Sequence, residues 1–222
     1  MFAIQEVSKY IIISSAKITN DRGTKMTKRA KIQRSEQVLS GKYLSDVQLK
    51  KLLQYINNKA DLARQRGATR AIIDEVIILL LVDAGLRANE LCCLNIRDLP
   101  IEHGENAILV RDDEGNVMRD VRITLKTAAR LERFVKLYRK GAKPAQPLLI
   151  SERGRRLSYM SLYSKVKRIG VNAGVGRLYP QLLRRTFQVR LYNAERDLRF
   201  VQNQAGHASP KTTAIYAKTE NQ

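Results

Sequence analysis

The sequence predicts a mainly α-helical fold with one small antiparallel β-sheet (α+β). Two observations support this prediction. The stretch Ala71–Val82 is almost wholly apolar, which is typical of a buried helix. Two short β-rich runs, Ala107–Val110 and Val121–Ile123, flank a segment that contains the turn signal Gly115-Asn116, and this order is typical of a β-hairpin.

A capping signal marks the first helix. The Ser45 oxygen can accept a backbone N–H of the first turn while the Gln48 side chain reaches back to the cap, which predicts a helix over about 46–58. Gly85 follows the apolar helix at a place where a left-handed residue would end it, and a further helix is expected from about Ala88.

Later helices are expected at about 127–140, 158–173, 181–193 and 197–204, with breaks at 141–144 and 170–180. The ordered core should span about 44–218. We therefore expect two parts, a basic N-terminal arm at 1–43 and a folded domain at 44–222.

The charge balance indicates a polyanionic partner. The chain has 222 residues, of which 44% are hydrophobic, and 41 Lys and Arg against 21 Asp and Glu give a net charge of +20. Such an excess favours nucleic acid through release of counterions, although a ribosomal-type or merely basic protein has a similar balance. Residues 22–34 contain six cations and no acid, and this segment is either an arm that lies on phosphates or a passive tail. The six cations are Arg22, Lys25, Lys28, Arg29, Lys31 and Arg34.

Other sequence features indicate a cytoplasmic protein without a metal or cofactor. Cys92 and Cys93 have no Cys or His partner at metal-ligand spacing, and they are expected to be reduced residues of the core. Asp74 and Glu75 interrupt the apolar stretch, so no run reaches transmembrane length and no membrane partner is expected.

One candidate anion site lies at the junction of two predicted helices. Arg87 stands there beside the N-terminus of the second helix, where backbone N–H groups favour a phosphate. Glu90, three residues on, can hold the guanidinium group by an ion pair. A surface arginine in a helical ion pair is the simpler alternative.

A second set of candidates lies near the C-terminal end. Arg184 and Arg185 are adjacent near the start of a predicted helix, and either could bind a phosphate oxygen. His207 follows, whereas the only other histidine, His103, is expected in a polar loop. Tyr216 comes nine positions after His207.

These residues resemble the tyrosine recombinase (phage integrase) family. The resemblance rests on G-L-R-x-x-E at Gly85–Glu90, on Gln181-Leu-Leu-Arg184-Arg-Thr-Phe against the pattern H-x-x-R-H-T-F, and on Gly206-His207 followed by Tyr216. The 23 positions from Arg184 to His207 also match. The alignment selects Arg184 over Arg185 as the second arginine.

The resemblance implies a mechanism and a fold. Tyr216 would attack a phosphodiester of double-stranded DNA to form a 3′-phosphotyrosyl link, while Arg87, Arg184 and His207 bind the phosphate. No metal or cofactor is implied. The implied fold is a helical catalytic domain with a small antiparallel sheet over 44–222, and self-association as a dimer or tetramer on DNA is expected.

Two positions depart from the family pattern. Gln181 stands where the family has a histidine, and it can bind a phosphate oxygen without transferring a proton near neutral pH. In the hairpin, Glu114 stands where the family has the lysine that protonates the leaving 5′-oxygen, and Lys126 is the nearest lysine downstream. The leading hypothesis is a site-specific recombinase; the alternatives are a weakened relative that regulates or shapes DNA, and a topoisomerase-like activity.

Overall fold

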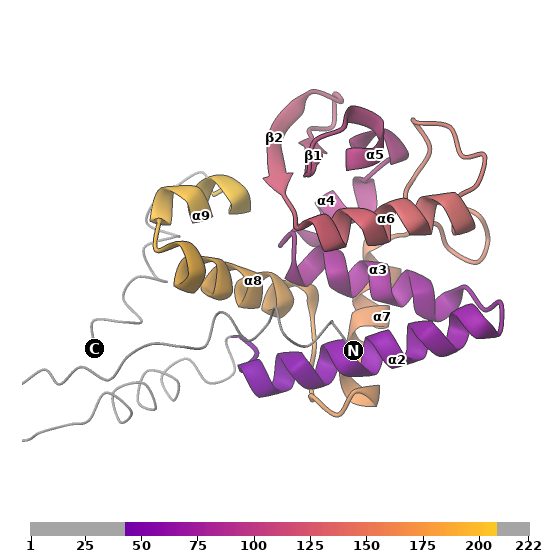
Figure 1. Ribbon diagram of the computed structural model, residues 1–222, viewed down its shortest axis with the longest axis horizontal. Helices are drawn as coiled ribbons and strands as arrows, with labels where there is room; N and C mark the ends of the chain where they lie inside the picture. The colour runs from indigo at the N-terminus through magenta and orange to yellow at the C-terminus, as the bar shows by residue number, and fades with distance from the viewer. Residues whose placement is uncertain (1–42, 208–222) are drawn as a thin grey trace, which may run out of the picture.

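The computed structural model describes residues 43–207, and in this part of the chain it confirms a mainly helical fold with a two-stranded antiparallel sheet (Figure 1). In chain order the elements are α2 (Asp46–Gln65), α3 (Arg70–Val82), α4 (Ala88–Cys93), the 3-10 helix η2 (Ile96–Asp98), α5 (Pro100–His103), β1 (Ala107–Arg111), β2 (Val117–Arg122), α6 (Leu125–Tyr138), α7 (Tyr159–Asn172), α8 (Pro180–Glu195) and α9 (Leu198–Ala205).

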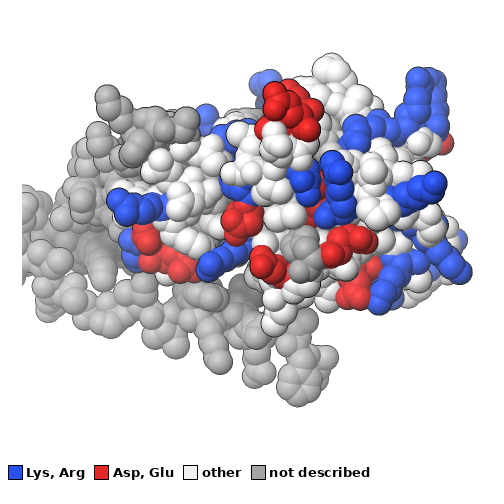
Figure 2. Space-filling model, turned by 90° about the horizontal axis from the view of Figure 1, so that it is seen from above, with Lys and Arg blue, Asp and Glu red and all other residues white. Residues whose placement is uncertain are grey.

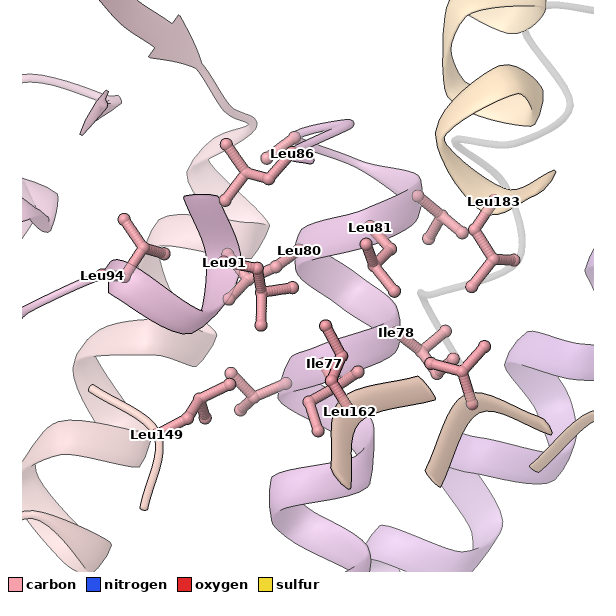
Figure 3. Packing of buried hydrophobic residues seen from close by; sticks show 14 of the residues in the cluster. Ile77, Ile78, Leu80, Leu81, Leu86, Leu91, Leu94, Leu149, Leu162 and Leu183 are labelled. Atoms are coloured by element: carbon pink, nitrogen blue, oxygen red, sulfur yellow. The ribbon is translucent and has the colours of Figure 1, made fainter. Parts of the chain in front are cut away.

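The apolar helix α3 is the centre of the core. It contacts α2, α4, α6, α7 and α8. Figure 3 shows its Ile77, Ile78 and Leu81 side chains packed near Leu162 of α7 and Leu183 of α8. Each of these side chains contributes about 1.5–3 kcal/mol when it is buried. Neighbours on every side explain why α3 is apolar around its whole circumference.

Two buried acids on α3 tie it to the surrounding helices. The Asp74 carboxylate bonds to Lys165 Nζ at 3.1 Å and to Arg168 Nη2 at 2.9 Å, both on α7, whereas Glu75 pairs with Arg64 of α2 and lies 3.5 Å from Arg130 of α6. Burial raises the pKa of Glu75 despite these cations. Each carboxylate therefore has two cationic partners, so one cation remains beside the buried charge if the other is removed.

The hairpin forms where the sequence predicts it, but its second strand is longer than expected. Val110 pairs with Arg119, whereas Arg111 pairs with Val117, so a β-bulge leaves an extra residue in β2. Gly115 takes a positive φ of 92° in the turn. Arg119 lies at the end of the regular part of the ladder, and the bulge lies between it and the turn.

Three local expectations need correction. Helix α2 runs to Gln65 rather than ending near 58, because Ala60 and Ala63 continue its buried face. His103 ends the short helix α5 instead of lying in a loop. Cys92 is buried as expected, whereas Cys93 is exposed, since α4 turns only one face toward the core.

Two glycines form the turns that follow α3 and α9. Gly85 has φ 58°, and a Cβ there would lie 2.0 Å from the Phe187 ring. Gly206 has φ 62°, and a Cβ there would lie 2.8 Å from the guanidinium group of Arg119. The Phe187 ring and the positive φ therefore both exclude a side chain at Gly85, whereas at Gly206 the positive φ is the main reason for glycine, because the end of an arginine side chain can shift.

Candidate active site

Arg87 lies at the N-terminus of α4, where the glycine turn after α3 places it. It is the N-cap residue of this helix, and its backbone N–H donates to Glu90 Oε2 at 2.7 Å. Its Nη1 donates to Glu90 Oε1 at 2.7 Å, which confirms the expected ion pair. The Arg87 side chain is 44% exposed, so the guanidinium group is both held and accessible.

Arg184 lies on α8 and is only 2% exposed. Its Nη1 donates to the Gly85 carbonyl at 2.6 Å, its Nη2 donates to the Ala205 carbonyl, and its Nη1 lies 3.9 Å from Glu90 Oε2. The neighbouring Arg185 is partly exposed, whereas Arg184 is buried among groups from α4, α8 and α9. The geometry therefore favours Arg184 as the second arginine of the site.

Arg119 of β2 is a third arginine of this cluster, and the sequence motifs did not single it out as a site residue. Its two Nη atoms donate to both Glu90 oxygens at 2.9 Å, and its Nε donates to the Gln204 carbonyl at 3.4 Å. A signal for it was present in the sequence, because the hairpin pattern of the family ends in an arginine at the position of Arg119. Its hydrogen bonds to Glu90 join distant segments of the chain, which a motif does not reveal.

Glu90 is the carboxylate that these arginines share. Burial alone would raise the pKa of Glu90, but the hydrogen bonds from Arg119 and Arg87 outweigh burial and lower the pKa to about 2. Three guanidinium groups surround this single carboxylate, so the cluster keeps an excess of positive charge at neutral pH.

The C-terminal end of α9 is joined to all three arginines. The carbonyls of Gln204, Ala205 and Gly206 accept from Arg119, Arg184 and Arg87, respectively. The Arg87–Gly206 bond measures 2.5 Å and joins residues 119 positions apart. The last carbonyls of a helix lack partners within the helix and carry partial negative charge, so cations suit them. In Figure 1, α9 lies beside β2 and above α8.

His207 follows this helix end directly. Its Nε2 lies 3.0 Å from the side-chain nitrogen of Gln188, a buried residue of α8. Burial and the positive charges of Arg184, Arg87 and Arg119 lower the pKa of His207 to about 4. The ring is therefore neutral at physiological pH, and it can donate to a phosphate oxygen or accept a proton, but it carries no charge.

The two positions that depart from the family pattern, Gln181 and Glu114, are both exposed. Gln181 occupies the first turn of α8, one turn before Arg184. Glu114 lies at the tip of the hairpin, where it accepts from the Asn116 side chain at 3.3 Å. Asp112 also accepts from Asn116, at 2.8 Å, and these bonds lower the pKa of Asp112. The acidic residues are thus bonded within their own turn. Lys126 is exposed on the first turn of α6.

Several predicted site residues lie outside the described residues. They are Tyr216 and the basic positions Arg22, Lys25, Lys28, Arg29, Lys31 and Arg34. On the face shown in Figure 2, Lys and Arg side chains are interspersed with Asp and Glu. The helices of residues 43–207 include none that is long and apolar enough to cross a membrane, and these residues form no His, Cys, Asp and Glu cluster suited to a metal.

The cluster has the chemistry of a phosphodiester site. Arginines can bind non-bridging phosphate oxygens and neutralise the charge that grows as a fifth oxygen approaches phosphorus. The neutral His207 adds a group that exchanges hydrogen bonds with the same oxygens. The helical fold and this arrangement are those that the resemblance to the tyrosine recombinases implies for a catalytic domain of that type.

The family comparison agrees with this class, since residues 42–222 match the description "Phage integrase family". The chain therefore belongs to the phage integrase family. It is 33% identical over 150 residues to "Tyrosine recombinase XerC" of Roseiflexus sp. (strain RS-1), covering 65% of this chain and 47% of that protein. It is 33% identical over 175 residues to "Tyrosine recombinase XerA" of Saccharolobus solfataricus, covering 79% of this chain and 51% of that protein.

Solved structures give the same result. The crystal structure of XerA recombinase superimposes with a TM-score of 0.66 at 27% identity, over 78% of this chain and 59% of that one. XerH site-specific recombinase bound to its difH substrate gives 0.65 at 27% identity, over 79% of this chain and 50% of that one. The chain thus spans about half the length of the curated relatives it matches.

Proposed function

We propose that this chain is a site-specific tyrosine recombinase that cleaves and rejoins DNA strands in the integration, excision or resolution of a DNA element. The observation that supports this most directly is the cluster of Arg87, Arg184 and His207. These residues come from α4, α8 and the end of α9, and they converge around Glu90 and one helix terminus. The family relationship and the solved recombinase–DNA complexes of relatives support the same reading.

In the proposed reaction, the phenol oxygen of Tyr216 forms a bond to phosphorus as the bond from phosphorus to the 5′-oxygen breaks. Arg87 and Arg184 hold the non-bridging oxygens, and His207 exchanges a hydrogen bond with one of them. The phenol loses a proton and the leaving 5′-oxygen gains one. Because the phosphotyrosyl link is a diester like the bond it replaces, the reverse step joins a new 5′-hydroxyl without ATP.

The rest of the chain has proposed roles in binding. The six cations of residues 22–34 would lie on DNA phosphates as an arm, and the domain at 44–222 would carry the chemistry. Self-association would occur on DNA, as a dimer or tetramer. Action on a phage or mobile DNA element would take place in the cytoplasm.

A second candidate function is a catalytically weakened relative that binds DNA as a regulator or architectural protein. The acidic residue at Glu114 and the replacement of a histidine by Gln181 favour it, because both remove proton-transfer groups. This candidate predicts DNA affinity without strand cleavage.

Covalent trapping separates the two candidates. A nicked duplex from the DNA that flanks the coding sequence releases a short 5′-hydroxyl fragment after cleavage, so a phosphotyrosyl adduct accumulates and survives denaturation. We expect the wild-type chain to form this adduct and Tyr216→Phe to form none, with a change in DNA binding below about 1 kcal/mol. Tyr192→Phe on α8 is the matched control and should form the adduct. Wild-type binding without any adduct would support the regulator.

A further inference from the structure

Gln188 is a buried polar side chain directly beside His207. It lies on α8 one turn after Arg184, is only 1% exposed, and its Nε2 lies 3.0 Å from His207 Nε2. A buried amide costs free energy unless it forms hydrogen bonds, so burial favours this contact between α8 and the site.

The chemistry of the two nitrogens determines the protonation of the ring. An amide nitrogen can only donate, so His207 Nε2 must accept, and the proton of the neutral ring then lies on Nδ1. A cationic ring would place two N–H groups opposite each other. The positive charges of Arg184, Arg87 and Arg119 also disfavour a cationic His207 ring. Glu90 is the carboxylate of this cluster, and it is already bonded to Arg87 and Arg119.

We propose that Gln188 is a positioning residue that fixes His207 as the neutral tautomer with its proton on Nδ1. In this form the ring presents Nδ1–H as its donor. The consequence for catalysis rests on the proposed function: Nδ1–H would donate to a phosphate oxygen that Arg87 and Arg184 also hold. The tautomer itself is inferred from the contact between α8 and the end of α9, without reference to DNA.

The alternative is that Gln188 merely fills space between α8 and α9. Two substitutions separate these roles. Gln188→Met keeps most of the volume and removes the amide. Gln188→Glu keeps the shape and presents only acceptors when it is ionised, so it should draw the proton to Nε2 and favour the imidazolium form. Unfolding transitions of both variants show whether the domain still folds.

Nitrogen-15 spectra of the histidine rings measure the tautomer directly. The full chain has two histidines, and the spectrum of His103→Gln assigns the ring of His207. We expect the wild type to show a protonated Nδ1 and an unprotonated Nε2 at pH 7. Gln188→Glu should move the proton to Nε2 and raise the pKa of His207, and Gln188→Met should give a mixture of tautomers. A wild-type proton on Nε2, or the same pattern in all three proteins, would overturn the proposal.

The cleavage rate gives a second readout. We expect Gln188→Glu to lower the rate of adduct formation roughly 10²-fold at a pH where the ring is neutral with its proton on Nε2, as for removal of one donor to the transition state, and the loss should shrink at lower pH, where the imidazolium ring again has an Nδ1–H. The KM for DNA should change little, because the other phosphate contacts remain. Since the spectra need no DNA, they test the tautomer even if the chain forms no adduct at all.

Discussion

Arg119→Ala tests whether the shared carboxylate holds the site together. Glu90 accepts two hydrogen bonds from Arg119 and two from Arg87. Together they lower its pKa from 4.5 to about 2, and this shift corresponds to about 3 kcal/mol of stability. Half of these bonds come from Arg119, whose side chain also packs in the cluster, so we expect the variant to be less stable by about 2 kcal/mol at pH 7.

The pH dependence of this difference follows from the direction of the shift. A carboxyl whose pKa is lowered by folding contributes stability above its unfolded pKa of 4.5, and this contribution disappears as the pH falls toward 2. At pH 3 less than about half of the contribution remains. The difference between wild type and Arg119→Ala should therefore shrink to about 1 kcal/mol at pH 3.

Urea unfolding at pH 7 and pH 3, followed by circular dichroism, measures both values. Arg122→Ala is the matched control, because Arg122 lies on the same strand with an exposed side chain, and its hydrogen bond to Gln204 uses only the backbone N–H. The control should change stability by less than about 0.5 kcal/mol. An equal destabilisation by Arg119→Ala at both pH values would refute the role of the Glu90 charge.

Three further predictions concern the turn, the arm and the hairpin. Gly85→Ala should lower the free energy of unfolding by more than about 3 kcal/mol, because the new Cβ would clash with the Phe187 ring. Gly67 has a similar φ but open space around it, so Gly67→Ala should lower the free energy of unfolding by only about 1 kcal/mol, and thermal unfolding compares the two variants. Removal of residues 1–34 should flatten the dependence of log DNA affinity on log salt by about 0.9 for each phosphate that the arm neutralises, and an unchanged slope would make the arm passive. Glu114→Lys should speed cleavage of ordinary DNA by about 10²-fold or more and leave a 5′-bridging phosphorothiolate substrate little changed; equal rates for the wild type on both substrates would mean that another group supplies the proton.

Local patterns were sufficient for the elements and for part of the site. The capping box at Ser45 and the turn at Gly115 each depend on residues close in the chain, and both are confirmed by the structure. The pair of Arg87 and Glu90 is also local, since one helical turn separates them.

The remaining parts of the site depend on contacts between distant segments. Arg119 bonds to Glu90 across 29 positions of the chain, at the place where α9 packs against β2. Gln188 contacts His207 only because α8 and α9 pack together. The real end of α2 likewise depends on its packing against α3. The spacing of residues along the chain does not determine these contacts between distant segments, so the sequence pattern could not predict them.

The hydrogen bonds at the end of α9 also affect how much side-chain entropy the arginines would lose on binding a phosphate. A free arginine side chain has about 2 kcal/mol of rotamer entropy, which is lost when the side chain binds a phosphate. Here the carbonyls of Gly85, Ala205 and Gly206 already restrict Arg87 and Arg184 in the DNA-free protein. That reduction in freedom accompanies folding rather than DNA binding. In the proposed reaction the two arginines would therefore bind both the intact strand and the pentavalent transition state with a smaller loss of side-chain entropy.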